Sequence, residues 1–100
     1  MSKRDEIGTH KTSVHTDDNG TTYVRYHKTV IAMRDNRGKI TLDSGGWKTA
    51  TTKTRMNQAL RVWGTGYYVH QVKHVWYVGV HKGNGVHARI CEYYDGVTLQ

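Results

Sequence analysis

Residues 40–63 read ITLDSGGWKTATTKTRMNQALRVW and contain the change of hydrophobic period that decides the fold. Up to Leu42 the residues alternate as in a β-strand, and Gly45-Gly46 then interrupts the pattern. Beyond the glycines, apolar residues recur at the i, i+3, i+4 and i+7 spacing of one helix face. These residues are Met56, Ala59, Leu60 and Trp63. The stretch therefore predicts a strand, a glycine turn and an amphipathic helix over residues 51–63.

Runs of β-branched and aromatic residues flank this helix on both sides. The runs cover residues 21–26, 29–33 and 39–42 before it, and 67–72, 75–81 and about 86–93 after it. His27-Lys28 lacks the Gly or Asn of a tight hairpin, so one bent strand is an alternative there. Residues 95–99 can add a last short strand. We predict an α+β fold: an antiparallel sheet of about five to six strands, in the order βββ-α-βββ, with one central amphipathic helix packed on it.

The first 20 residues differ in texture from the rest of the chain. Met1, Ile7 and Val14 are their only aliphatic residues, and neither periodicity is visible. We predict a flexible N-terminal arm over residues 1–20 and a single α+β domain over residues 21–100.

Composition excludes several classes of protein. Apolar runs do not exceed four residues, so no membrane span is expected. The single Cys91 excludes an internal disulfide and a multi-cysteine zinc site. No Gly-rich nucleotide loop is apparent, so we predict no cofactor. Asp43 and Glu92 are isolated and Asp17-Asp18 lies in the predicted arm, so paired-carboxylate catalysis is not expected. Two facing histidines without a carboxylate or thiolate make a weak metal site, so we predict no metal.

The charge is concentrated in the second half of the chain. There are 15 Lys and Arg against 8 Asp and Glu, and no carboxylate lies between Asp43 and Glu92. A positive segment of this length is typical of a protein that binds a polyanion, with an affinity that falls steeply with salt.

Two surfaces are expected to carry this charge. On the helix, Lys53, Asn57 and Arg61 form one stripe and Arg55 flanks the other side of the apolar face. In the last hairpin, pairing of Val80 with Ala88 and of Val78 with Ile90 places Tyr77, Arg89, Cys91 and the facing His81 and His87 on the outer face. The predicted binding residues are Lys48, Thr51, Thr52, Lys53, Arg55, Asn57, Arg61, Tyr77, His81, His87 and Arg89.

Two other functions compete with binding of nucleic acid. A metal-independent ribonuclease could use His81, His87 and Arg89 as acid, base and phosphate ligand, although no diagnostic spacing supports it. A protein–protein inhibitor would meet an acidic host partner through the same positive surface. We therefore predict a binding protein rather than an enzyme.

The motif SGGWKTATTKTRMN at residues 44–57 resembles one found in a family of small tailed-bacteriophage proteins. Residues 66–69, 75–78 and 95–99 are similar to the same family, so the likeness covers about residues 20–99. The resemblance implies a viral accessory protein that acts in the host bacterial cytoplasm, and it implies no activity.

These observations combine into one functional hypothesis. We expect a small basic phage protein that binds nucleic acid or a host nucleoprotein complex without catalysis, as a host-takeover or anti-defence inhibitor. No membrane partner is expected, and an exposed edge strand is compatible with a homodimer.

Overall fold

The computed structural model describes residues 11–81 and 87–100, with only the backbone of His87 included. Within these residues there are eight strands and one helix. The elements are β1 (Thr12–Thr16), β2 (Thr22–Tyr26), β3 (Thr29–Arg34), β4 (Ile40–Leu42), α1 (Ala50–Val62), β5 (Tyr67–Val72), β6 (Val75–His81), β7 (His87–Glu92) and β8 (Val97–Leu99). The predicted α+β class with one central helix is confirmed.

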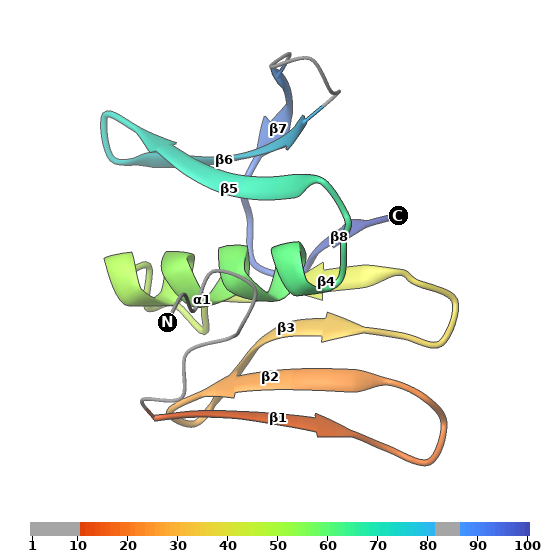
Figure 1. Ribbon diagram of the computed structural model, residues 1–100. Coiled ribbons are helices and arrows are strands. Elements are labelled where there is room, and N and C mark those ends of the chain that lie inside the picture. The colour runs from red at the N-terminus through yellow and green to blue at the C-terminus, as the bar shows by residue number, and fades with distance from the viewer. Residues whose placement is uncertain (1–10, 82–86) are drawn as a thin grey trace, which may run out of the picture.

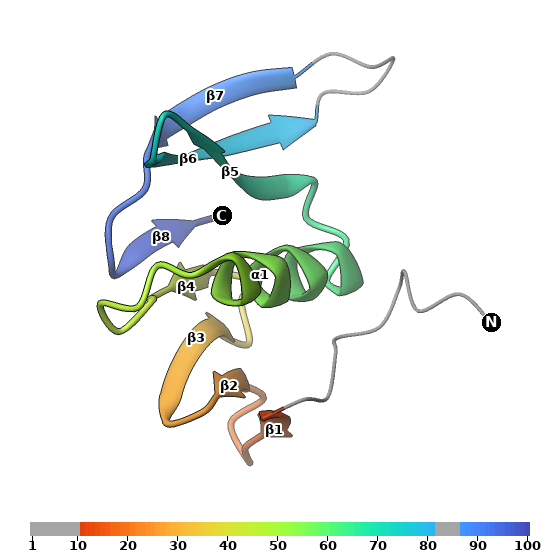
Figure 2. The same ribbon diagram turned by 90° about the vertical axis from the view of Figure 1, so that its left-hand side faces the viewer.

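The strands of the described residues form two antiparallel sheets where a single sheet was predicted. The first has the order β1-β2-β3-β4-β8 and the second the order β5-β6-β7. Helix α1 lies between the two sheets (Figures 1 and 2). Strand β8 follows β7 in sequence but returns to pair with β4, so the chain closes back onto the first sheet.

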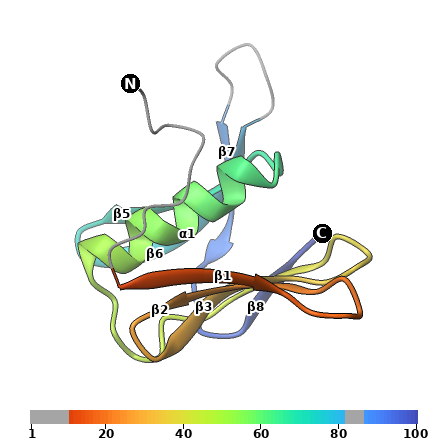
Figure 3. The same cartoon turned by 60° about the horizontal axis from the view of Figure 1, so that its bottom comes forward.

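Strand β1 corrects the predicted arm over residues 1–20. It pairs with β2 from Thr12 opposite Tyr26 to Thr16 opposite Thr22, along the edge of the first sheet (Figure 3). As an edge strand it exposes most of its side chains, Val14 included. It therefore needs few apolar residues, which explains why sequence periodicity missed it. Residues 1–10 lie outside the described part of the chain.

A tight two-residue turn joins β2 to β3, as the hairpin interpretation required. Tyr26 pairs with Thr29, and His27 adopts a positive φ of 56° that an L-residue accepts at some cost. Within β3, Ile31 forms a bulge, because the neighbouring residues Val30 and Ala32 pair with consecutive residues of β2. The bulge lets Ile31 and Ala32 both be buried although they are adjacent in sequence.

One hydrophobic core serves the helix and both sheets. Met56, Ala59 and Leu60 are fully buried between Ile31 and Leu42 of the first sheet and the buried residues of the second. The second sheet and the residues after it contribute Val69, Trp76, Val78 and Tyr93. Because α1 packs against a sheet on each side, its apolar side chains must contact both sheets.

The helix begins at its cap and ends near the predicted boundary. The Thr49 side chain accepts a hydrogen bond of 3.2 Å from the Thr52 N–H, which satisfies one of the unpaired donors of the first turn. Thr52 is buried in this role. Gly64, with a φ of 67°, follows the C-cap Trp63.

Asn57 attaches the helix to the edge strand of the second sheet. Its amide nitrogen donates to the Val69 carbonyl at 2.9 Å, and its amide oxygen accepts from the Val69 N–H at 2.7 Å. Val69 is buried, and these two backbone groups point away from β6. The Asn57 side chain therefore supplies the hydrogen bonds that a neighbouring strand would otherwise make.

Asp95 joins the crossover between the sheets to the loop that follows β4. Its Oδ1 atom accepts hydrogen bonds from the Ser44 N–H at 2.8 Å, the Ser44 hydroxyl at 2.7 Å and the Tyr93 hydroxyl at 2.8 Å. Partial burial opposes ionisation, but these bonds outweigh it and hold the pKa of Asp95 below its ordinary value. Burial and the bond to Asp95 raise the pKa of Tyr93, so its hydroxyl stays a donor.

Replacing Asn57 tests its attachment to β5. We expect Asn57→Ala to lower the free energy of unfolding by about 2 kcal/mol, because both backbone groups of Val69 lose their partner. Thr54→Ala, at an exposed position of the same helix, is the matched control and should change stability by less than about 0.5 kcal/mol. Chemical denaturation followed by circular dichroism measures both, and equal effects would contradict the assignment.

The Asp95 junction predicts a dependence of stability on pH. Because the pKa of Asp95 is lower in the folded chain, its stabilisation is complete above the ordinary value of 3.8 and is lost as the pH falls through the folded value. Because Asp95 is exposed and solvent screens its charge, Asp95→Asn should lower stability at neutral pH by about 1 kcal/mol or less and flatten the acid limb of the stability curve. Asp18→Asn, in the exposed β1–β2 turn, is the control. Parallel acid limbs for wild type and Asp95→Asn would refute the prediction.

Candidate functional site

Four aromatic or imidazole rings and one guanidinium follow one another across the second sheet. The ring centroids of His81 and Tyr68 are 4.6 Å apart, those of Tyr68 and His70 5.4 Å, and those of His70 and Tyr77 5.6 Å. The Arg89 Cζ atom lies 3.9 Å from the centroid of Tyr77. We call these five residues the aromatic row.

The register of the strands explains why the row forms. Side chains alternate between faces, so Tyr68 and His70 of β5 share the face of Tyr77 and His81 of β6. Helix α1 and the core cover the opposite face of this sheet (Figure 2). Gly79 is opposite Tyr68, and a Cβ atom on it would lie 2.6 Å from the ring carbon Cζ of that tyrosine. Glycine therefore gives the Tyr68 ring room to lie over β6.

The last hairpin follows the predicted register only in its first half. Val80 pairs with Ala88 as expected, but Val78 pairs with Cys91 because Ile90 forms a bulge. Cys91 consequently packs against the core, not on the outer face as predicted, and Ile90 is exposed. Tyr77 and Arg89 lie on the same face, as predicted, and the Arg89 guanidinium contacts the Tyr77 ring.

The structure places the predicted helical residues on two different sides of α1. The Lys53 ammonium donates to Gln71 at 3.2 Å beside β5. Arg55 instead donates through Nε to the Thr12 hydroxyl at 3.0 Å, and so faces β1 in the first sheet. Arg61 lines a pocket of about 410 Å³ with Tyr68 and His81. The basic residues of the helix therefore do not form one surface.

Several other predicted residues have structural partners. Thr52 is buried under the helix cap, and Asn57 is bonded to Val69. Lys48 lies 5.7 Å from the ring centroid of Tyr93, close to the start of the helix. Thr51, in the first turn, is half-buried. Of these residues, Asn57 lines the same pocket as Tyr68 and His81 of the aromatic row.

The predicted pair of His81 and His87 is matched in the backbone register of β6 and β7. His81 joins the row through Tyr68. The side chain of His87 and the loop at residues 83–85 lie outside the described part of the chain. The backbone also places Glu92 opposite Tyr77, so a carboxylate-bearing residue stands at one end of this face.

The surroundings of His70 lower the pKa of its imidazole. Partial burial of the ring disfavours its charged form and has the largest effect. The positive charges of Arg89 and Lys53 lower the pKa of His70 further. The imidazole is thus neutral at physiological pH. It presents a flat, uncharged ring between two tyrosines.

Sequence reasoning missed Tyr68 and His70. The signal was present in YYVHQV at residues 67–72, where alternation puts both residues on one face. Their placement against β6 depends on the two-residue turn Lys73-His74, whose residues both have positive φ, 50° and 71°. Such a turn is typical of the sequence Asn-Gly, so the sequence Lys-His gives no indication of it.

Within residues 11–81 and 87–100, no three His, Cys, Asp or Glu side chains lie close enough together to hold a metal ion. No helix of these ranges is long and apolar enough to cross a membrane.

The chain belongs to the Kyanoviridae Gp96 protein family, whose family model matches residues 1–100. This family of phage proteins confirms the resemblance to tailed-bacteriophage proteins. Comparison with the curated proteins found no match, and comparison with the solved structures found none either.

The environment of His70 leads to a direct prediction. Its imidazole should titrate below the ordinary value of 6.5, and Arg89→Ala or Lys53→Ala should raise the pKa by removing a nearby positive charge. The unfolded chain then binds the proton more readily, so the unfolding free energy decreases as the pH drops below 6.5. Proton NMR titration of the ring measures the pKa. Arg37→Ala, in the β3–β4 turn, is the control; a His70 pKa insensitive to both variants would count against the prediction.

Proposed function

We propose that this phage protein binds single-stranded nucleic acid, alone or within a host nucleoprotein complex, through the aromatic row. The succession of four rings and a guanidinium on one sheet face is the observation that carries the proposal. Open sheet faces with aromatic side chains bind unpaired bases by stacking, which is worth about 1–3 kcal/mol per base.

The order of the residues suits a strand that crosses the sheet. Tyr68 and Tyr77 are separated by the neutral ring of His70, so the centre of the row offers aromatic surface without charge. Arg89 supplies a positive charge at the Tyr77 end, where Glu92 stands opposite Tyr77 and offsets part of it, and Arg61 lies next to Tyr68 and His81 at the other end. Bases would stack in the middle while phosphates meet cations at both ends.

Lys53 and the net charge of +7 support the same proposal at longer range. Lys53 is close enough to His70 to lower its pKa, so its positive charge reaches the row from the helix side. A positive protein attracts any polyanion, whereas rings in a row favour unpaired bases over a duplex. The expected preference is therefore for single strands.

In the host cell, such binding would act without catalysis. A protein of 100 residues that occupies the strand needed by a host defence or transcription complex would inhibit that complex. The site proposed for this role is the aromatic row and not the whole predicted set of basic residues.

Binding of a fluorescent single-stranded oligonucleotide, followed by anisotropy, tests the proposal. We expect Tyr68→Ala and Tyr77→Ala each to weaken binding about tenfold through lost stacking. Arg89→Ala should weaken binding and reduce the salt slope by about one. Tyr94→Ala, which removes an exposed tyrosine outside the row, is the matched control and should bind as wild type does.

Three outcomes would overturn the proposal. They are an absence of binding at low salt, an affinity independent of salt, and equal effects of Tyr77→Ala and Tyr94→Ala. Cleavage of the oligonucleotide in chelator, lost in His81→Ala, would favour the ribonuclease alternative instead. Capture of an acidic host protein that survives nuclease treatment would favour the inhibitor of a protein partner.

A further inference from the structure

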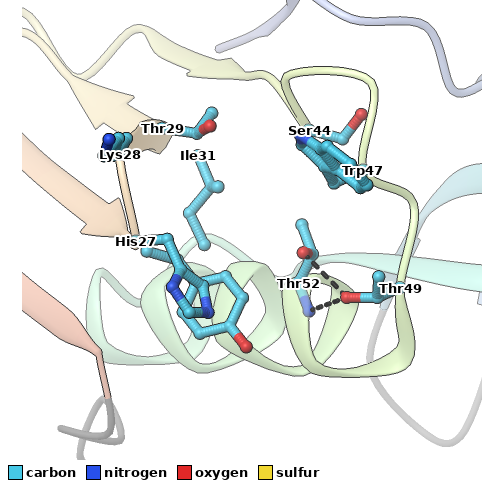
Figure 4. Close-up of a pocket in the computed structure, with 9 residues that line it drawn as sticks. His27, Lys28, Thr29, Ile31, Ser44, Trp47, Thr49 and Thr52 are labelled. Atoms are coloured by element: carbon cyan, nitrogen blue, oxygen red, sulfur yellow. Dashed lines mark hydrogen bonds between the residues drawn. The ribbon is translucent and has the colours of Figure 1, made fainter.

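A second concave site lies at the other side of the molecule, between the β2–β3 turn and the loop that precedes α1. Its volume is about 430 Å³, within the range of about 300–1,000 Å³ of small-molecule sites. His27, Lys28 and Ile31 lie on one side of it and Trp47 and Thr52 on the other (Figure 4). None of these residues belongs to the aromatic row.

Two backbone features shape the pocket, one on the hairpin side and one on the loop side. On the hairpin side, the positive φ of His27 forms the tight turn. On the loop side, Gly45 has a φ of 64°, and a Cβ atom there would lie 2.7 Å from the Thr29 hydroxyl oxygen. The loop therefore touches β3 at a point that only glycine permits. The Ser44 N–H and hydroxyl both donate to Asp95, which holds the same loop in place.

Trp47 is the unusual feature of the pocket. A tryptophan is ordinarily well buried, yet 71% of Trp47 is exposed while Ile31 in the same pocket is buried. An exposed indole beside an apolar hollow is suited to a flat aromatic ligand, which stacks on the ring and enters the hollow.

The charge around the pocket favours an anionic ligand. Lys28 and His27 line it, and none of its nine lining residues is acidic. Two carboxylates that adjoin the loop before α1 have hydrogen-bond partners there: Asp43 accepts from the Gly45 N–H at 2.7 Å, and Asp95 accepts from the Ser44 N–H at 2.8 Å. The hydroxyl of Thr29 adds a hydrogen-bonding group to the hairpin side.

We propose that this pocket binds a nucleoside monophosphate group, with its base against the Trp47 indole and its phosphate at Lys28. The flat base matches the Trp47 indole, its hydrogen-bonding edges match hydroxyl groups such as that of Thr29, and the negative phosphate matches Lys28. The group could come from a free nucleotide or from the 5′-phosphorylated end of a strand. The proposal does not depend on binding by the aromatic row.

Two-dimensional ¹H–¹⁵N NMR of the intact chain tests this site. AMP and UMP are titrated in turn, with adenosine, uridine and inorganic phosphate as partial ligands. We expect shifts at residues 27–31 and 44–52 and at the Trp47 indole N–H, while the buried Trp76 indole serves as an internal reference. A 5′-phosphorylated oligonucleotide and its unphosphorylated form distinguish a strand end from a free nucleotide.

Variants separate the two halves of the ligand. Trp47→Ala should weaken binding of AMP about tenfold or more, and because the side chain is exposed the fold should persist. Lys28→Ala should weaken AMP about tenfold and leave adenosine unchanged. Lys39→Ala, an exposed lysine in the β3–β4 turn at the opposite end of the first sheet (Figure 1), is the matched control.

The outcomes are distinguishable from those for the aromatic row. Shifts confined to the pocket with a free nucleotide, or with the phosphorylated strand end alone, support the site and identify its source. Absence of shifts with every ligand at millimolar concentration overturns it, as do equal affinities of wild type and Trp47→Ala. Shifts at Tyr68, His70 and Tyr77 alone would support the aromatic row and overturn the pocket.

Discussion

The carboxylate of Asp95 holds the crossover that the rest of the structure needs. After β7 the chain must leave the second sheet, pass the start of the helix and pair with β4 in the first. At that point Asp95 binds Ser44 through backbone and side chain, and the Gly96 N–H donates to the Leu42 carbonyl at 2.8 Å. The Asp95 side chain thus holds the loop before α1, and the adjacent backbone bond from Gly96 joins the entry of β8 to the end of β4. Because that loop also carries Trp47, the shape of the pocket depends on the same carboxylate.

The shared core explains why the two candidate sites are separate. Helix α1 fills the space between the sheets with Met56, Ala59 and Leu60, so the inner face of each sheet is buried. The second sheet can then present polar and aromatic residues only on its outer face. The pocket with Trp47 forms instead at the edge of the core, between the β2–β3 turn and the loop before the helix, with the buried Ile31 among its lining residues.

Sequence patterns predicted the elements well where burial imposed a period. The helix face from Met56 to Trp63 and the alternation of residues 67–81 required no tertiary information. Strand β1 was missed because an edge strand with exposed residues has no such period. The division into two sheets was missed because the hairpin patterns identify neighbouring strands only. They do not show that β8 pairs with β4 and leaves β5, β6 and β7 as a separate sheet. The bulge at Ile90 changed the side of Cys91, and a one-residue insertion of this kind leaves no mark in an apolar pattern.

The candidate site was harder to predict because charge is a property of the whole chain and binding is a property of one surface. The segment without carboxylates does contain Arg55 and Arg89, yet the first reaches toward Thr12 of β1 and the second lies over Tyr77. Net charge therefore draws a polyanion to the molecule without deciding where it binds. What singles out one face is the register of β5 against β6, which brings His70 beside Tyr77 and sets the Tyr68 ring over Gly79. Placement of the rings, and not the number of cations, is the property on which recognition by this face would depend.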